Sequence, residues 1–312
     1  MSSISHRSRR RAGSAVLAVA GLVFGASCQS ATDALLQATD PDLINPSDIA
    51  TPDGADALRV GTLGRLTTMT ASAPANTEGV WFMGGLLTDE WKSGDTFVQR
   101  DETDKRTIQE DNSIVTAGYR YLHRARISAN QAIAALKTYK PSPASGIGQM
   151  YFVSAYAHVL LGEDFCTGQP FADGSSGALE GGDVKTTAEV FQMAAAVADT
   201  GLTANGNATD ATTVRVKNAL LVTRARALMN LGGAANYAAA AALVAGVPTS
   251  FTYDATFLQI SGDNGIWALN NNAKRYVVGD SVEGTARIFN ASDCCWAKIS
   301  RFTEEIARSS AR

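Results

Sequence analysis

The sequence predicts an all-α protein in which helical hairpins stack into a solenoid-like scaffold, with irregular loops and short strands as minor parts. Two observations lead to this fold class. From residue 48 onward the chain is rich in alanine, and its apolar residues recur at helical spacing. Two of these segments also end in the same dipeptide, Leu161-Gly162 and Leu231-Gly232, which indicates a repeated helical unit.

The first helix is expected over residues 53–69, where one apolar stripe repeats every three residues. Pro74 follows this segment, and proline is incompatible with the interior of a continuing helix. The stripe consists of Ala57, Val60, Leu63, Leu66 and Met69.

Clearer helical patterns cover residues 112–136, 148–161 and 186–202. The second of these is strongly apolar and is closed by Gly162, a residue type that favours helix C-termini. The third begins with Thr186 followed by Glu189, the spacing of a capping box.

Residues 214–231 and 238–247 are expected to form a helical hairpin broken at Gly232-Gly233, with Pro248 ending the second arm. In this hairpin Tyr237, Ala241 and Val244 are placed much as in a tetratricopeptide repeat, where small residues let paired helices pack closely. An earlier helix pair, residues 148–161 and 186–202, is interrupted by a Gly-rich insertion at residues 163–185. The alternative fold is an irregular all-α bundle. Residues 252–260 and 275–278 fit either short strands or irregular loops.

The N-terminus has the order of a secretory signal peptide over residues 1–27. Four arginines precede a short apolar run, and Gly25-Ala26-Ser27 leads directly into Cys28. The apolar run is shorter than the roughly 20 residues that span a bilayer. We therefore expect export and lipidation at Cys28, followed by a polar tether over residues 28–47. Plain secretion and an uncleaved anchor are the alternatives.

Composition excludes several function classes. The net charge is −3 and the leader contains four arginines, so the mature chain is acidic and has no electrostatic reason to bind nucleic acid.

The sequence lacks the serine-elbow, zinc-protease and phosphate-loop motifs. Neighbouring acids such as Asp89-Glu90 and Glu163-Asp164 do not flank a scissile bond. We expect no catalytic residues, no metal site and no cofactor.

The remaining cysteines leave the disulfide state open. Cys166 has two possible partners, Cys294 and Cys295, and the adjacent pair is too close along the chain to bond without strain.

Several segments taken in succession resemble the RagB/SusD family of nutrient-binding outer-membrane lipoproteins. They are TDPDLINPSDI (39–49), GGLLTDEWKSGDTF (84–97), YRYLHRARISANQAIAAL (119–136), MYFVSAYAHVLLGEDFCTGQPF (150–171) and VTRARALMNLGGAANYAAAAALVAGVPTSFTY (222–253). The order and spacing of these segments cover most of residues 28–284.

The resemblance implies a tetratricopeptide-like scaffold that captures a nutrient, often a glycan, without catalysis. The implied partner is a TonB-dependent SusC-like β-barrel transporter. The implied location is the outer membrane, where the lipid-anchored protein faces the cell surface. The helical domain is expected over residues 48–284. It is expected to be incomplete, because members of the family are longer. Residues 285–312 form an atypical tail, which a frameshift or premature stop near Glu283 would explain; a genuinely short member is the alternative. The alternative to nutrient capture is a function of another class: a helical-repeat envelope scaffold for protein–protein contacts.

Two clusters are candidate ligand-binding sites. Trp81, Trp91, Phe97 and Asp95 surround a Gly-rich segment, and sugars are commonly held between aromatic rings and carboxylates. Phe165 and Gln169 lie in the 163–185 insertion, and loops on rigid frames often carry function. Core packing of the aromatics is the competing interpretation, because buried rings contribute much of a core. The charged run at residues 100–111 is expected to be a solvated helix face.

Overall fold

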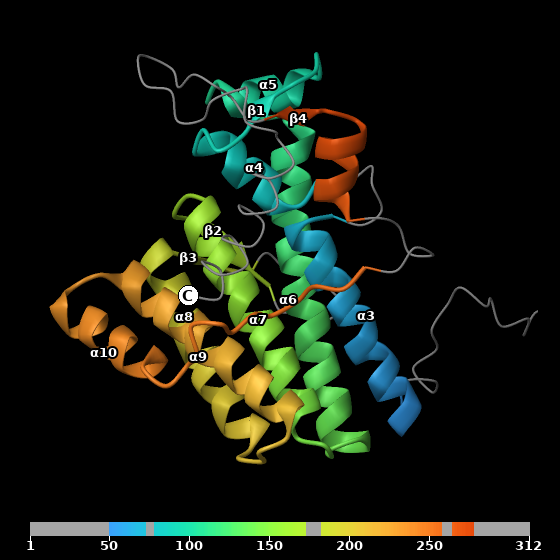
Figure 1. Ribbon diagram of the computed structural model, residues 1–312, viewed down its shortest axis with the longest axis vertical. Helices are drawn as coiled ribbons and strands as arrows, with labels where there is room; N and C mark the ends of the chain where they lie inside the picture. Colours follow the sequence, from blue (N-terminus) through green and yellow to red (C-terminus); the bar gives the residue numbers. More distant parts are fainter. Residues whose placement is uncertain (1–49, 73–77, 173–181, 258–263, 278–312) are drawn as a thin grey trace, which may run out of the picture. The chain divides into compact units, whose positions relative to one another are not determined.

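The computed structural model describes residues 50–72, 78–172, 182–257 and 264–277, and these are mainly helical (Figure 1). The chain divides into two units, Met1–Asp48 and Ile49–Arg312, and every described residue belongs to the second. The expected signal peptide, Cys28, the tether and the tail over residues 285–312 therefore lie outside the described residues. In the described part the all-α prediction is confirmed.

Four of the described helices begin at residues whose side chains satisfy the free backbone amides of the first turn. Thr51 caps α3 (Pro52–Thr70), and Asn112 caps α6 (Ser113–Tyr139). α8 (Thr187–Asn205) starts with the predicted capping box of Thr186 and Glu189. Asp210 caps α9 (Ala211–Leu231), which ends at Gly232 with φ of 72°.

The long helices pack as successive neighbours in the order α3, α6, α7, α8, α9, α10 (Figure 1). α7 (Ser145–Asp164) also contacts α9, and its side chains are buried almost all round. This burial explains why its sequence is apolar without a clear stripe. α10 (Ala234–Val244) lies at the end of the row, with Ala240 as its one buried residue. The expected hairpin of α9 and α10 is confirmed, although α10 begins four residues earlier than expected.

The main core draws chiefly on α3 and on α6 to α9 and includes Leu122, Met150, Val153 and Leu220. A second core is built from the end of α3, the short helix α4 (Val80–Leu87), Trp91 and the segment after residue 264. Its buried members are Ala71, Phe82, Leu86, Trp91, Ile266, Leu269 and Tyr276. A second short helix, α5 (Val98–Asp104), packs against α4. The π-helix η1 (Trp267–Asn272) leads into β4 (Tyr276–Val277), which pairs antiparallel with β1 (Lys92–Ser93). Within the segment at residues 275–278, Tyr276 and Val277 thus form a short strand rather than a loop.

The 163–185 insertion contains a second small sheet. β2 (Gln169–Phe171) pairs antiparallel with β3 (Asp183–Lys185). The other segment that fitted either strand or loop has no regular structure over residues 252–257, where it is described.

The prediction of a solvated face for residues 100–111 is wrong at Arg100. This guanidinium is 3 % exposed because it enters the second core and pairs with Glu78, whose carboxylate is also buried. Arg100 Nε donates to Glu78 Oε1 over 2.8 Å. Burial alone would lower the pKa of Arg100, but the hydrogen bond and charge of Glu78 raise it above its ordinary value.

Candidate functional site

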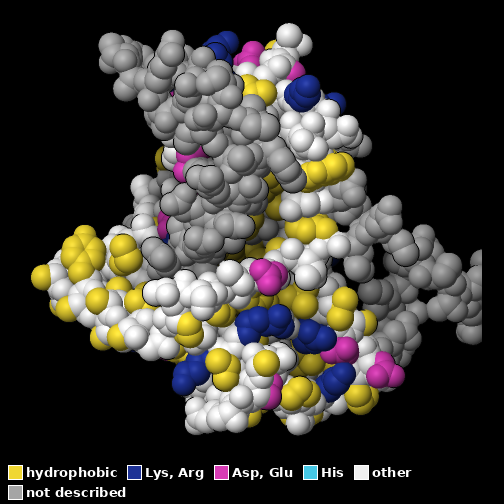
Figure 2. Space-filling view, viewed as in Figure 1, with side chains coloured by type: hydrophobic (Ala, Val, Ile, Leu, Met, Phe, Trp, Pro, Cys, Tyr) yellow, Lys and Arg dark blue, Asp and Glu magenta, His cyan; other side chains and the backbone are white. Residues whose placement is uncertain are grey.

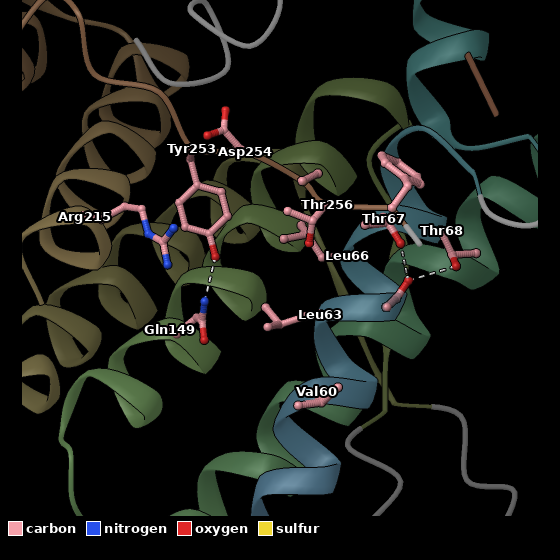
Figure 3. A pocket seen from close by; sticks show the side chains of 13 residues that line it. Val60, Leu63, Leu66, Thr67, Thr68, Gln149, Arg215, Tyr253, Asp254 and Thr256 are labelled. Carbon is pink, nitrogen blue, oxygen red and sulfur yellow. Dashed lines mark hydrogen bonds between the residues drawn. The ribbon is translucent and has the colours of Figure 1, made fainter. Parts of the chain in front are cut away.

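A cavity of about 610 Å³ lies between α3, α7, α9 and the extended residues 251–257, which we call the strap (Figure 3). In Figure 1 the strap is the orange segment that leaves α10 and crosses in front of α9 and α7 toward α3. α3 contributes one apolar wall with Val60, Leu63 and Leu66. Gln149 and Arg215 approach from α7 and α9 (Figure 3).

Tyr253 fixes the strap to the helices. Its ring lies 4.5 Å from the Phe152 ring, measured between centroids, and its hydroxyl accepts a hydrogen bond of 3.0 Å from Gln149 Nε2. Arg215 stands beside the ring, with Cζ 5.8 Å from the ring centroid. Burial raises the pKa of Tyr253 above its ordinary value, so this hydroxyl is neutral at physiological pH.

A smaller cavity of about 290 Å³ lies beyond Gln149. The Gln149 carbonyl accepts a hydrogen bond of 2.9 Å from Arg59, and Arg59 in turn pairs with Asp56. Lys140, at the end of α6, pairs with the same Asp56 carboxylate over 3.4 Å. Gln149 lines both cavities and is bonded on both sides, so it forms a fixed partition between them.

The predicted aromatic cluster lies in another part of the molecule. Trp91 is 4 % exposed and meets Phe82 and Tyr276 edge to face or nearly so. The expectation that Trp91 offers a platform for a sugar is corrected, because its ring is enclosed by the second core; core packing was the competing interpretation. Trp81 is half-buried and packs against both cores.

Asp95 and Phe97 are organised around Arg100 instead of a cavity. Asp95 pairs with Arg100 over 2.5 Å and with Arg275 over 3.8 Å. The Phe97 ring is 43 % exposed, and the Arg100 guanidinium lies 4.7 Å from its centroid. These two residues lie beside the same guanidinium, and the Asp95 carboxylate is already paired with arginine.

Phe165 and Gln169 hold the insertion against the helices. Phe165 packs edge to face on Tyr119 with centroids 5.0 Å apart. Gln169 is buried, and its amide donates to the Leu161 carbonyl over 2.9 Å and to that of Phe165 over 3.3 Å. Neither residue lines the cavity under the strap, and the structure gives both a role in packing.

Buried titratable groups gather near the base of this insertion. Burial lowers the pKa of His123 and of His158 to about 4, and the nearby charge of Arg126 adds to the effect. Both imidazoles are therefore neutral at pH 7. No group of three or more His, Cys, Asp or Glu side chains is arranged to hold a metal ion in the described part of the chain. Cys166 is exposed and forms no disulfide with a described residue, while Cys294 and Cys295 lie outside that part.

The residues that line the cavity were missed by sequence reasoning. The signal was weak: the aromatic run SFTY at residues 250–253 follows the helix-ending Pro248, and nothing in it shows which helices it crosses. Gln149 and Arg215 sit within ordinary helical patterns. Only their meeting under Tyr253 distinguishes them.

Within the described ranges, no helix combines the length and apolar character needed to span a bilayer. No family model, curated protein or solved structure matches this chain.

Proposed function

We propose that this chain is an exported lipoprotein of the RagB/SusD type that captures a small nutrient, most simply a glycan, at the cell surface. The role is capture and release without catalysis, followed by handover to a TonB-dependent SusC-like β-barrel in the outer membrane. Support comes from the leader that ends at Cys28 and from the ordered succession of segments that resemble the family.

The proposal includes the assignment of the helices to tetratricopeptide-like pairs. α7 with α8 and α9 with α10 are taken as two tetratricopeptide-like pairs, the first interrupted by the insertion that carries β2 and β3. Direct packing between the members of each pair supports this assignment. So do the glycines after Leu161 and Leu231, since Gly162 lies against the Phe191 ring of α8 with no room for a Cβ.

The cavity under the strap is the observation that carries the proposal. Its volume of about 610 Å³ falls in the range of small-molecule sites, and it combines an apolar wall with a few polar groups at fixed positions. The Tyr253 ring, the aliphatic wall of α3 and the Arg215 guanidinium offer a saccharide both stacking surface and hydrogen-bond donors.

The test is to fill the cavity. Gly64 lies in the lining, and a Cβ built on it meets no atom within 4 Å, so Gly64→Leu is expected to place its side chain in the cavity. Gly61 is the matched control: it is on the same helix, has the same open surroundings and is not in the lining. A glycan that raises the Tm of the wild type and of Gly61→Leu is expected to have no effect on Gly64→Leu. A panel of glycans that stabilises none of the three chains would contradict nutrient capture.

The partner is tested separately by purifying the full-length, signal-bearing protein from detergent-solubilised outer membrane. A large β-barrel recovered in near-equal amount supports the uptake complex. Recovery in the membrane fraction without a barrel contradicts that part of the proposal.

One observation favours the second candidate, an envelope scaffold. The exposed side of the α9–α10 hairpin carries large apolar side chains, with Met229 54 % and Tyr237 53 % exposed. A scaffold predicts loss of co-purifying proteins in Tyr237→Lys with no ligand effect on the Tm of the wild type.

A further inference from the structure

Most polar groups around the cavity under the strap already have partners. Gln149 is bonded through both its amide and its carbonyl, to Tyr253 and Arg59. The Thr67 hydroxyl donates to the Gly64 carbonyl over 2.7 Å. Arg215 is different, because no acidic residue in the described part of the chain pairs with it. Its guanidinium lines the cavity and stands beside the Tyr253 ring, where its donors can meet a group that enters.

The charges near this guanidinium leave a positive excess. Arg59 and Lys140 share the single carboxylate of Asp56 on the other side of Gln149. Asp254 is the one acid among the described lining residues, and in Figure 3 its carboxylate points away from the cavity. Figure 2 shows Lys and Arg side chains on the lower half of this face, with Asp and Glu side chains and hydrophobic ones among them. An anionic group bound at Arg215 therefore meets net attraction.

The remaining surface of the cavity is apolar. Leu63 and Leu66 of α3 and Phe257 of the strap line it, and the Tyr253 ring stands at its edge. A ligand that fits needs an apolar C–H face for this surface and an anionic group for Arg215. Guanidinium binds carboxylates through two parallel hydrogen bonds.

We propose that the cavity under the strap binds a carboxylate-bearing saccharide, with the carboxylate on the Arg215 guanidinium and a sugar face against Leu63 and Tyr253. This inference rests on the proposed function and narrows its ligand from glycans in general to uronate-containing ones. Because Arg215 is exposed and its charge is uncompensated, binding is expected to weaken as salt screens the pair.

The experiment compares tri-galacturonate with its methyl ester, which has the same sugar face without the charge. Isothermal titration of the full chain, purified in detergent, is expected to give a Kd at least about tenfold lower for the acid, the effect of a hydrogen-bonded charge. Arg215→Gln is expected to abolish this preference. Lys217→Gln, an exposed change on the same helix outside the lining, is expected to keep it.

Each other outcome is decisive. Equal binding of the acid and the ester by the wild type overturns the carboxylate assignment and leaves glycan capture standing. A preference for the acid that survives in Arg215→Gln overturns the role of Arg215. Binding of neither probe also overturns the uronate proposal, and the glycan panel with Gly64→Leu then decides separately whether nutrient capture fails as well.

Discussion

At the scale of single residues, the end of α7 holds two adjacent carboxylates in opposite situations. Glu163 accepts from Arg226 over 2.7 and 2.5 Å and from Asn230 over 2.7 Å, so its charge is compensated. Burial raises the pKa of the neighbouring Asp164 to about 7, and the charge of Glu163 raises it further against the opposing effect of Arg226. Asp164 is thus the carboxyl whose ionisation costs stability.

Replacing Asp164 by Asn tests this cost through its pH dependence. The folded pKa lies above the unfolded value of about 3.9, so the folded chain binds the extra proton between about pH 4 and pH 7. The contribution of Asp164 to stability therefore falls as pH rises through that window. We expect Asp164→Asn to raise the free energy of unfolding by on the order of 2 kcal/mol at pH 8 and to leave it nearly unchanged at pH 4.

Urea titrations of both chains from pH 4 to pH 8 measure this difference. His123 and His158 act in the opposite sense, because their folded pKa values are lowered to about 4 and their stability contribution grows as pH rises toward 6.5. Subtracting the wild type from the variant cancels that background. A difference that does not change with pH contradicts the raised pKa of Asp164.

Single residues were also where sequence reasoning was weakest. Trp91 has the composition and neighbours of a sugar platform, yet its environment is set by Tyr276 from a distant strand. Arg226 lies in an ordinary helical pattern of α9, and its partner Glu163 comes from α7. Residue type predicts what a side chain can do, whereas the partner that decides its role comes from tertiary packing.

At the scale of elements, prediction succeeded where the signals are local. α8 begins with the capping box predicted from Thr186 and Glu189, and α9 ends at Gly232, as expected. α4 was missed because it is short and its N-cap makes no side-chain hydrogen bond, whereas α5 covers only the first part of the charged run that was expected to be helical. α4 is held by the second core, which requires residues from the segment after 264 and cannot be read from a local window.

A glycine at the α7–α8 contact gives the test at this scale. A Cβ on Gly148 would lie 2.6 Å from Asn205 Cβ and 2.9 Å from Asn205 Cα, so the start of α7 meets the backbone at the end of α8. Gly148→Ala is expected to lower the free energy of unfolding by about 1–3 kcal/mol through overpacking. Gly61→Ala on α3, with open space around it, is expected to raise it by about 0.5–1 kcal/mol through helix propensity.

Chemical denaturation followed by circular dichroism compares these two variants with the wild type. The same Gly→Ala change is made in two helices, and the expected changes in the free energy of unfolding have opposite signs. The comparison therefore isolates the effect of the surroundings. If Gly148→Ala is as stable as Gly61→Ala, the close approach of α7 and α8 is wrong.

At the scale of the whole described body, two cores are joined by few side chains. Trp81 packs against both, and Phe257 of the strap packs against the second. The second core is closed only when the chain returns after residue 264, where the Gly265 amide donates to the Ser72 carbonyl over 3.1 Å at the end of α3. The strap thus connects the cavity to the closure of the second core.

Tyr276 is the residue through which this closure is tested. It is 1 % exposed, with its ring 4.5 Å from Phe82 and 5.7 Å from Trp91 between centroids. Tyr276→Ala is expected to cost about 3–5 kcal/mol in the second core, as for other large buried aromatic residues. Because α6 to α9 do not use Tyr276, tryptophan fluorescence should change at a lower urea concentration than the helical signal at 222 nm.

Tyr237→Ala, an exposed change on α10, is the control and should shift neither curve appreciably. If both signals of Tyr276→Ala move together, the two cores unfold as one cooperative unit, and the second core is an integral part of the helical scaffold.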